Sequence, residues 1–180
     1  MQSIAVPVKR AVTGLVLAVA LSICPHIEAV GAEDLPKESV LPLMMATKAA
    51  QASLESCKKD GYRVSVSVVD RAGLLRAMIR ADGAGSHTID SSRKKAYTAA
   101  SLRRPTSELA ELINKVSTLQ ALREMNDQVL ILGGGLPIEI GGDVVGGIGV
   151  GGAPGAHLDD ACAQAGLDAI GAASKISATK

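Results

Sequence analysis

The sequence has no tryptophan and no phenylalanine, and it has only two tyrosines in 180 residues. Proteins that bind single-stranded nucleic acid stack the bases on aromatic side chains, and this chain lacks such platforms. Lys and Arg total 19 while Asp and Glu total 18, so no strong positive field attracts a phosphate backbone. We therefore expect no nucleic-acid partner, and we expect a core of aliphatic side chains.

Long uncharged runs are also rare, and the longest lies near the start of the chain. The basic pair Lys9-Arg10 precedes an uncharged, mostly apolar run over residues 11–23, which is short for a membrane span. Small or apolar residues follow at 30–32, as a signal peptidase site requires. This order is typical of a signal peptide, although a retained membrane anchor is the alternative.

We predict cleavage after Ala32, which makes residues 1–32 a signal peptide and residues 33–180 a single domain. The mature protein would be periplasmic or secreted, would have no membrane span, and would carry equal numbers of acidic and basic side chains.

Cysteine and histidine are scarce, with three of each, and no Cys-x-x-Cys pair is present. A structural zinc site is therefore not expected. Cys57 and Cys162 remain after cleavage, and each lies among helix-forming residues near one end of the mature chain. They either form a disulfide between two terminal helices or stay as separate buried thiols.

Hydrophobic periodicity predicts an α+β fold for the mature chain. Alternating or β-branched runs indicate five strands, and three- and four-residue spacing indicates four helices and a less regular turn. The expected strands are 62–69, 74–79, 128–132, 136–140 and 144–150, and the expected helical segments are 35–59, 88–102, 107–116, 119–125 and 158–174. The order implies one largely antiparallel, five-stranded sheet with helices on its faces.

Two side-chain patterns refine this picture. In the strand at 62–69, valines at 64, 66 and 68 share one face, while Ser65 and Ser67 share the other. In the first helix, Leu43 and Met44 belong to the apolar stripe that we expect to be buried.

Glycines punctuate the last third of the chain. Residues 147–152 match G-x-G-x-x-G, but the 28 residues that follow indicate one helix instead of the second strand of a dinucleotide site, and Asp168 lies within that helix. The glycines instead indicate the close approach of a helix, a neighbouring backbone or a flat ligand. Phosphate-loop and nucleophile-elbow motifs are both missing, so we assign no catalytic residue.

The segment 80–109 is polar and basic and lies between two apolar regions. It contains the helix expected at 88–102, which cannot continue through Pro105. Small or apolar residues at 89, 92, 96, 99 and 100 form a narrow stripe along this helix. Its cations are Arg93, Lys94, Lys95, Arg103 and Arg104. We expect this helix to wall a shallow cleft against the glycine-rich strand at 144–150. The alternative is a solvated helix that covers the sheet.

His87 precedes the basic helix in a glycine-flanked loop, so we expect it to be exposed. An exposed histidine is either incidental or a ligand for haem iron or another metal. Asp159 and Asp160 lie beside His157 at the expected start of the last helix. Carboxylates there either cap the helix and oppose its dipole or belong to a metal site.

Three stretches of the sequence are similar to a known family. They are VSVSVVDRAGLL, RADGAGSHTIDSSRKKAYTAASLRRPTSEL and GGGLPIEIGGDVVGGIGVGGAPGAHLDDACAQAGLDAI. Together they resemble the haem-binding and haem-degrading domain family of GlcG/HbpS-like proteins over residues 41–172. The resemblance implies a profilin-like α-β layer, assembly into homo-oligomers that often have eight subunits, and haem or iron binding in some members.

The resemblance also implies site residues. Lys95, Thr98, Arg104 and Thr106 stand where the family motif has like residues, and a threonine ligand to haem is a family possibility, for which Thr98 or Thr106 would serve. His87 departs from the motif, which usually has a small or apolar residue there.

We therefore expect an exported protein that binds haem, a related tetrapyrrole or iron as a small-molecule ligand. The predicted ligand-binding residues are His87, Arg93, Lys95, Thr98, Arg104 and Thr106, with His87 also the candidate metal ligand. One alternative is a protein that binds or converts a small carboxylic or 2-hydroxy acid through Lys95 or Arg93. The other is a structural oligomer subunit without catalysis.

Overall fold

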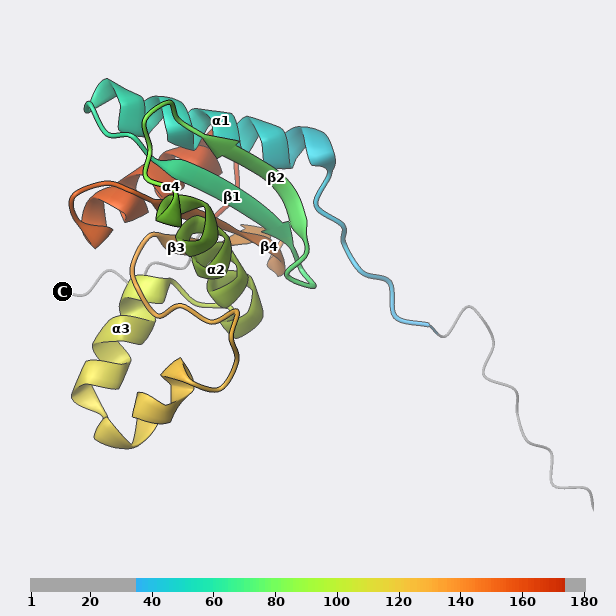
Figure 1. Cartoon of the computed structure of the whole chain (residues 1–180). Helices are drawn as coiled ribbons and strands as arrows, with labels where there is room; N and C mark the ends of the chain where they lie inside the picture. The colour runs from blue at the N-terminus through green and yellow to red at the C-terminus, as the bar shows by residue number, and fades with distance from the viewer. Residues whose placement is uncertain (1–34, 174–180) are drawn as a thin grey trace, which may run out of the picture. The chain divides into compact units, whose positions relative to one another are not determined.

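The computed structural model describes residues 35–173 (Figure 1). The predicted signal peptide at 1–32 lies outside the described residues. The architecture that follows belongs to the unit that begins at Glu38.

The sheet has four strands, all antiparallel, in the order β2-β1-β4-β3. The strands are β1 (Ser65–Asp70), β2 (Leu75–Arg80), β3 (Gly135–Ile140) and β4 (Asp143–Gly151). The expected α+β class and antiparallel sheet are confirmed. The profilin-like arrangement that the resemblance implies stays a prediction.

The expected fifth strand, at 128–132, was wrong. This segment forms no strand, because its polar and apolar groups find partners on helices. The Leu130 amide donates to Thr98 Oγ1 at 2.8 Å, and Ile131 packs in a small cluster with Leu109 and Ile113.

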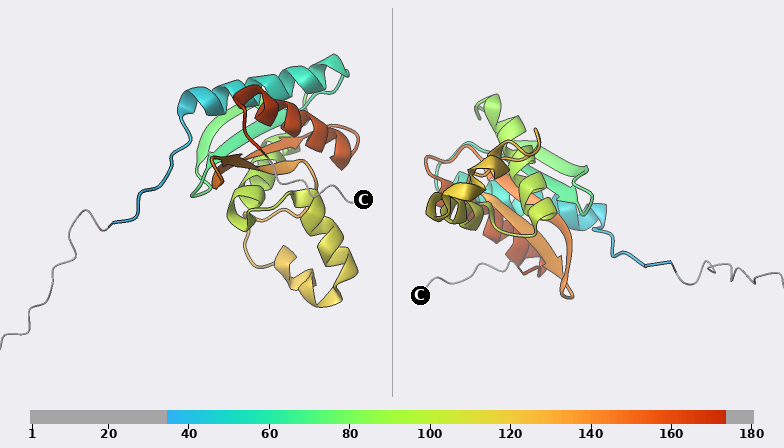
Figure 2. Two further views of the ribbon diagram at one scale, coloured as in Figure 1. Left: turned by 180° about the vertical axis from the view of Figure 1, so that it is seen from behind. Right: turned by 90° about the horizontal axis from the view of Figure 1, so that it is seen from below.

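The helices cover both faces of the sheet. They are α1 (Leu43–Lys59), α2 (His87–Leu102), α3 (Thr106–Lys115) and α4 (Ala156–Ile170), together with a 3₁₀ helix, η2 (Ser117–Arg123). Helices α1 and α4 lie side by side on one face, and α2 lies on the other (Figures 1 and 2). Helix α3 and η2 extend from the α2 side.

Strand β1 and the residue before it divide their side chains between these two layers as predicted. Val64, Val66 and Val68 belong to the main hydrophobic core with α1 and α4. Ser65 and Ser67 face α2, where their hydroxyls hydrogen-bond Thr88 Oγ1 and Ser92 Oγ at 2.7 and 2.8 Å. Pairing these hydroxyls removes the cost of burying them.

The expected apolar stripe of α1 was wrong at its start, whereas Ala50 and Cys57, which belong to the same stripe, are buried. Leu43 and Met44 are 54% and 81% exposed. The buried side chains are small, namely Ala46, Ala49, Ala50, Ser53 and Cys57. Helix α4 approaches so closely at Gly166 that even a methyl group there would collide with Ser53 Oγ. This contact leaves no room for larger side chains between the helices.

Cys57 of α1 and Cys162 of α4 form a disulfide, with their Cα atoms 5.5 Å apart. The bond closes a loop across a sequence separation of 105. In the chain-entropy model, such a loop stabilises the fold by about 4–5 kcal/mol relative to the reduced chain. The disulfide therefore fixes the helix pair that covers one face of the sheet.

Helix α2 rests directly on β4. A Cβ atom at Gly147 or Gly149 would collide with the carbonyl oxygen of Ala96 or Ser92. The close approach of a helix therefore explains these glycines. The expected cleft between α2 and the length of strand 144–150 was wrong, because helix backbone fills that space.

Candidate functional site

Open space remains where α2 and α4 begin. A cavity of about 350 Å³ lies beside the end of β4 and the loop that follows it. Its walls are His87, Ser91, Lys95, Leu132, Asp159 and the loop 151–156. Most side chains of the loop are small, so the backbone itself forms much of the wall. We call this space the His87 cavity.

The floor of the His87 cavity is a buried ion pair. Lys95 and Asp159 are 2% and 3% exposed. Lys95 Nζ donates to Asp159 Oδ2 at 2.8 Å and to the Val150 carbonyl oxygen at 2.9 Å. Asp159 Oδ1 accepts a hydrogen bond from the Ala153 amide at 3.0 Å. One ammonium group thus connects α2, the end of β4 and the start of α4.

Burial raises the pKa of Asp159, because a carboxylate loses its hydration there. The Lys95 ammonium and the amides of Ala153 and Gly152 oppose that shift. Burial also raises the pKa of Asp160, and the Gly134 amide and the Ser107 hydroxyl act against it. Both carboxyl groups therefore depend on specific partners to stay charged.

The glycine turn at 133–135 lies over this ion pair. A Cβ atom at Gly134 would lie 2.7 Å from Asp159 Cβ and 2.9 Å from Lys95 Nζ. Gly134 also has a φ of +109°, a conformation that favours glycine. Its amide donates to Asp160 Oδ1. Within residues 35–173, no three His, Cys, Asp or Glu side chains are grouped so that they could hold a metal ion.

The sequence alone does not indicate that Asp159 is the partner of Lys95. The two residues are 64 positions apart, and an acid at a helix start usually caps that helix. The feature that could have indicated such a partner is the position of Lys95 beside the small-residue stripe of its helix. A lysine that is buried there needs an acidic side chain close to its ammonium group.

The structure brings together two of the six predicted ligand residues, His87 and Lys95. Arg93 lies on the outer side of α2, where it contacts Gln128 and Asp90. Arg104 lies just after α2, with its Nε 3.8 Å from Glu108 Oε2.

The two predicted threonines also lie apart from the His87 cavity. Thr98 Oγ1 donates to the Lys94 carbonyl oxygen at 2.7 Å and accepts from Leu130 N. Thr106 Oγ1 accepts from the Gly135 amide at 2.9 Å. Both hydroxyls are buried and hydrogen-bonded within the protein.

His87 is the first residue of α2, and its side chain is exposed at the cavity. The ring packs over Gly85, where a Cβ atom would lie 2.6 Å from His87 Cε1. His157 has the same arrangement at the start of α4, over Gly155, but it does not line the cavity. The two histidines therefore form a matched pair for experiments.

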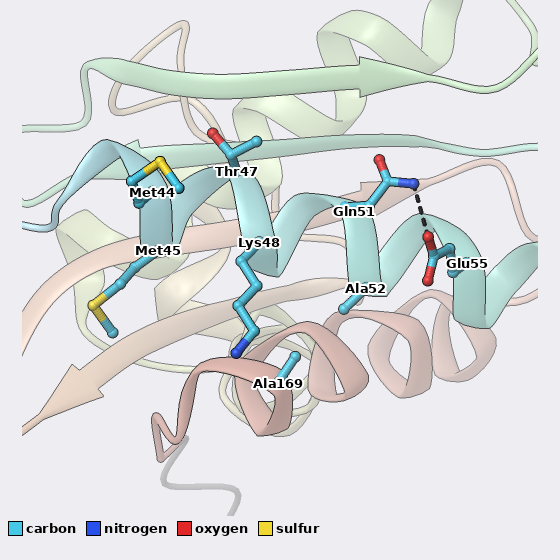
Figure 3. A pocket seen from close by; sticks show the side chains of 8 residues that line it. All are labelled: Met44, Met45, Thr47, Lys48, Gln51, Ala52, Glu55 and Ala169. Atoms are coloured by element: carbon cyan, nitrogen blue, oxygen red, sulfur yellow. Dashed lines mark hydrogen bonds between the residues drawn. The ribbon is translucent and has the colours of Figure 1, made fainter.

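A second cavity, of about 640 Å³, lies on the outer side of α1 beside Ala169 of α4 (Figure 3). Its walls include Met44, Met45 and Ala52, and the Lys48 side chain extends toward α4. We call it the methionine groove. It is larger and more apolar than the His87 cavity, and thioethers are also known haem ligands.

The model of the HbpS-like family, described as a haem degrading protein, matches residues 41–168. The chain belongs to this family. The match covers almost the whole span over which the sequence resembles the family, and it includes every residue of the His87 cavity.

Relatives with known sequences agree with this assignment. A 15.0 kDa protein from the dhaT-dhaS intergenic region of Citrobacter freundii is 37% identical over 115 residues, covering 63% of this chain and 81% of the relative. Protein GlcG of Escherichia coli K12 is 32% identical over 111 residues, covering 62% and 81%.

Solved structures share the fold. A double mutant of Streptomyces reticuli HbpS is 44% identical with a TM-score of 0.72, covering 79% of this chain and 94% of that chain. The PduOC:heme complex is 26% identical with a TM-score of 0.71, covering 76% and 99%. One of these similar structures was therefore solved with haem bound.

Proposed function

We propose that this protein binds haem in the His87 cavity. The observation that carries the proposal is an exposed imidazole at a cavity with mostly small-residue walls, in a chain of the HbpS-like family. The haem complex of a similar structure supports it. The comparisons do not favour the alternatives of a small-acid protein or a purely structural subunit.

The residues of the cavity fit a haem. A flat macrocycle needs walls without bulky side chains, and the loop 151–156 offers glycine, alanine and proline. Leu132 is 47% exposed at the same cavity and supplies apolar surface. An imidazole nitrogen of His87 would hold the iron, since histidine is a common axial ligand. Bound haem would supply a redox-active iron centre.

Polar groups at the cavity would receive the propionates. An ammonium has three N–H donors, and Lys95 uses two of them, on Asp159 and Val150. Lys95 and Ser91 both line the cavity, so the third ammonium donor and the Ser91 hydroxyl would be the groups that receive a propionate. Asp159 keeps Lys95 in position, so its role is to hold the floor of the cavity in place.

The His87 cavity of one subunit is too small to enclose a whole haem. About 350 Å³ lies near the lower limit of ligand pockets, so part of a haem would protrude from one subunit. A second subunit would cover the protruding edge.

The haem proposal predicts that hemin titration gives a Soret band that saturates at one haem per chain. His87→Ala should weaken binding about 10-fold or more and change the band, because the iron loses its axial ligand. His157→Ala is the matched control and should bind like wild type. No saturable band would reject haem binding.

The same titration tests the other predicted residues. Arg93 and Arg104 would meet a ligand only on the outer side of α2, and Thr98 and Thr106 would have to release existing hydrogen bonds. If Thr98→Val, Thr106→Val or Met45→Ala, in the methionine groove, lost haem binding while His87→Ala kept it, the haem would bind at a site other than the His87 cavity.

We also propose self-association, for which the family resemblance implies eight subunits. Large apolar side chains are exposed at the start of α1 and after the β1–β2 turn, namely Val40, Leu43, Met44, Leu74 and Leu75. Val40 lies beside residues 70–72 of that turn. Large apolar side chains that are exposed in two neighbouring segments are typical of an interaction surface.

The proposed assembly predicts that Met44→Asp combined with Leu74→Asp reduces the sedimentation coefficient to that of a single subunit. A charge cannot be buried in an apolar interface without a partner. The control is Met125→Asp, which changes an exposed methionine outside this surface. An unchanged oligomer in the double variant would contradict this surface.

We further propose that the protein is exported. The Cys57–Cys162 disulfide supports this, because such bonds persist in oxidising compartments. Within residues 35–173, no helix combines the length and apolar character of a membrane span. Mass spectrometry of the native protein should give a chain that begins at Glu33, whereas an intact Met1 would contradict export by cleavage.

A further inference from the structure

A third cavity, of about 390 Å³, lies at the end of α1, beside the end of β2. Its walls include Leu54, Lys58, Tyr62, Arg63, Arg80 and Asp82. Figure 1 shows that the C-terminal end of α1 and the loop after β2 lie at the same end of the sheet. None of these side chains takes part in the proposed haem site. We call this space the Tyr62 cavity.

The charges at the Tyr62 cavity do not balance. Lys58, Arg63 and Arg80 contribute three cations, and Asp82 contributes the one carboxylate. Within the described part of the chain, none of these three cations forms an ion pair. The excess is local, because the whole chain has almost equal numbers of acids and bases.

Arg80 is hydrogen-bonded within the protein, and Arg63 packs against the loop after β2. Arg80 donates from Nε and Nη2 to the Ala84 carbonyl oxygen, at 3.1 and 2.6 Å, which fixes the guanidinium plane. The Arg63 side chain lies against Gly83, where a Cβ atom would be 3.1 Å from Arg63 Cδ. Guanidinium groups bind carboxylates and phosphates through charge-assisted hydrogen bonds, and Nη1 of Arg80 and the Arg63 guanidinium could donate to such a ligand.

The same cavity has an apolar side. Tyr62 and Leu54 are half-buried and pack against the main core. The Tyr62 amide donates to the Cys57 carbonyl oxygen at 2.9 Å, and the Gly61 amide donates to the Lys58 carbonyl oxygen at 3.0 Å. These bonds satisfy carbonyl groups at the end of α1. The remaining dipole of about half a negative charge is smaller than the cationic excess.

We infer that the Tyr62 cavity binds a small organic anion with two negative charges and an aromatic or apolar part. Its charges would be carboxylate or phosphate groups, which the cations would hold, while Tyr62 and Leu54 would contact the apolar part. The inference is independent of the haem proposal. The backbone of Arg63 and Val64 separates the two cavities, and Gly152 of the His87 cavity packs against it.

The two tyrosines of the chain allow a direct test in the full protein. Tyr62 lines the cavity, whereas Tyr97 packs on Gly73 in the β1–β2 turn, at the other end of β2 from Arg80. In NMR spectra with labelled tyrosine rings, phenyl phosphate and isophthalate should shift the Tyr62 signals in a saturable way. The Tyr97 signals should stay fixed, and neutral benzyl alcohol should shift neither ring.

Matched variants identify the charges responsible. Lys58→Gln and Arg63→Gln should each weaken phenyl phosphate binding about 10-fold, since each removes a charge-assisted contact. Lys59→Gln changes the neighbouring exposed lysine, which does not line the cavity, and should bind like wild type. Unchanged Tyr97 signals would show that each variant is folded.

Phenyl phosphate and isophthalate distinguish a phosphate ligand from a carboxylate ligand. Binding of either anion alone supports the inference and identifies which of the two groups the cavity prefers. Equal affinities in Lys58→Gln, Arg63→Gln and wild type would overturn it. No Tyr62 shift with either anion would also overturn it, as would loss of the shift in His87→Ala.

Discussion

The buried contact between Lys95 and Asp159 is the constraint on which the rest of the structure depends. Two charges that leave water lose several kcal/mol of hydration each, and only close pairing with further hydrogen bonds restores that loss. Here the ammonium has two acceptors, and both carboxylate oxygens are occupied. Because these partners come from α2, β4 and α4, the contact fixes the walls of the His87 cavity.

The glycines of the last third follow from this constraint. For Lys95 to reach Val150 and Asp159, α2 must lie directly on β4, and Gly147 and Gly149 permit that approach. Gly134 must then cross close above the pair. The same close approach fills the expected cleft along the strand, and the His87 cavity lies instead where α2 and α4 begin.

The features that could be predicted from the sequence are those that depend on the spacing of neighbouring residues. The alternation of valine and serine around β1 and the antiparallel sheet follow from side-chain spacing, whereas the glycines of β4 left a helix, a backbone or a flat ligand as possible neighbours. The failures involve partners distant in sequence. Segment 128–132 has strand-like residues, but its Leu130 amide hydrogen-bonds to Thr98 and its Ile131 side chain packs against α3. Met44 is exposed because Gly166 brings α4 against the small side chains of α1. The cations of α2 were expected to act together, yet one is buried and the others face outward.

A double-mutant cycle on Lys95→Met and Asp159→Leu, measured as the free energy of unfolding in urea, tests this account most directly. Each single variant should lose about 3–5 kcal/mol, because the remaining charge stays buried without its partner. The double variant should lose clearly less than the sum of the two, because neither charge is then present. Losses below about 1 kcal/mol that simply add would contradict the claim that this contact holds the site together.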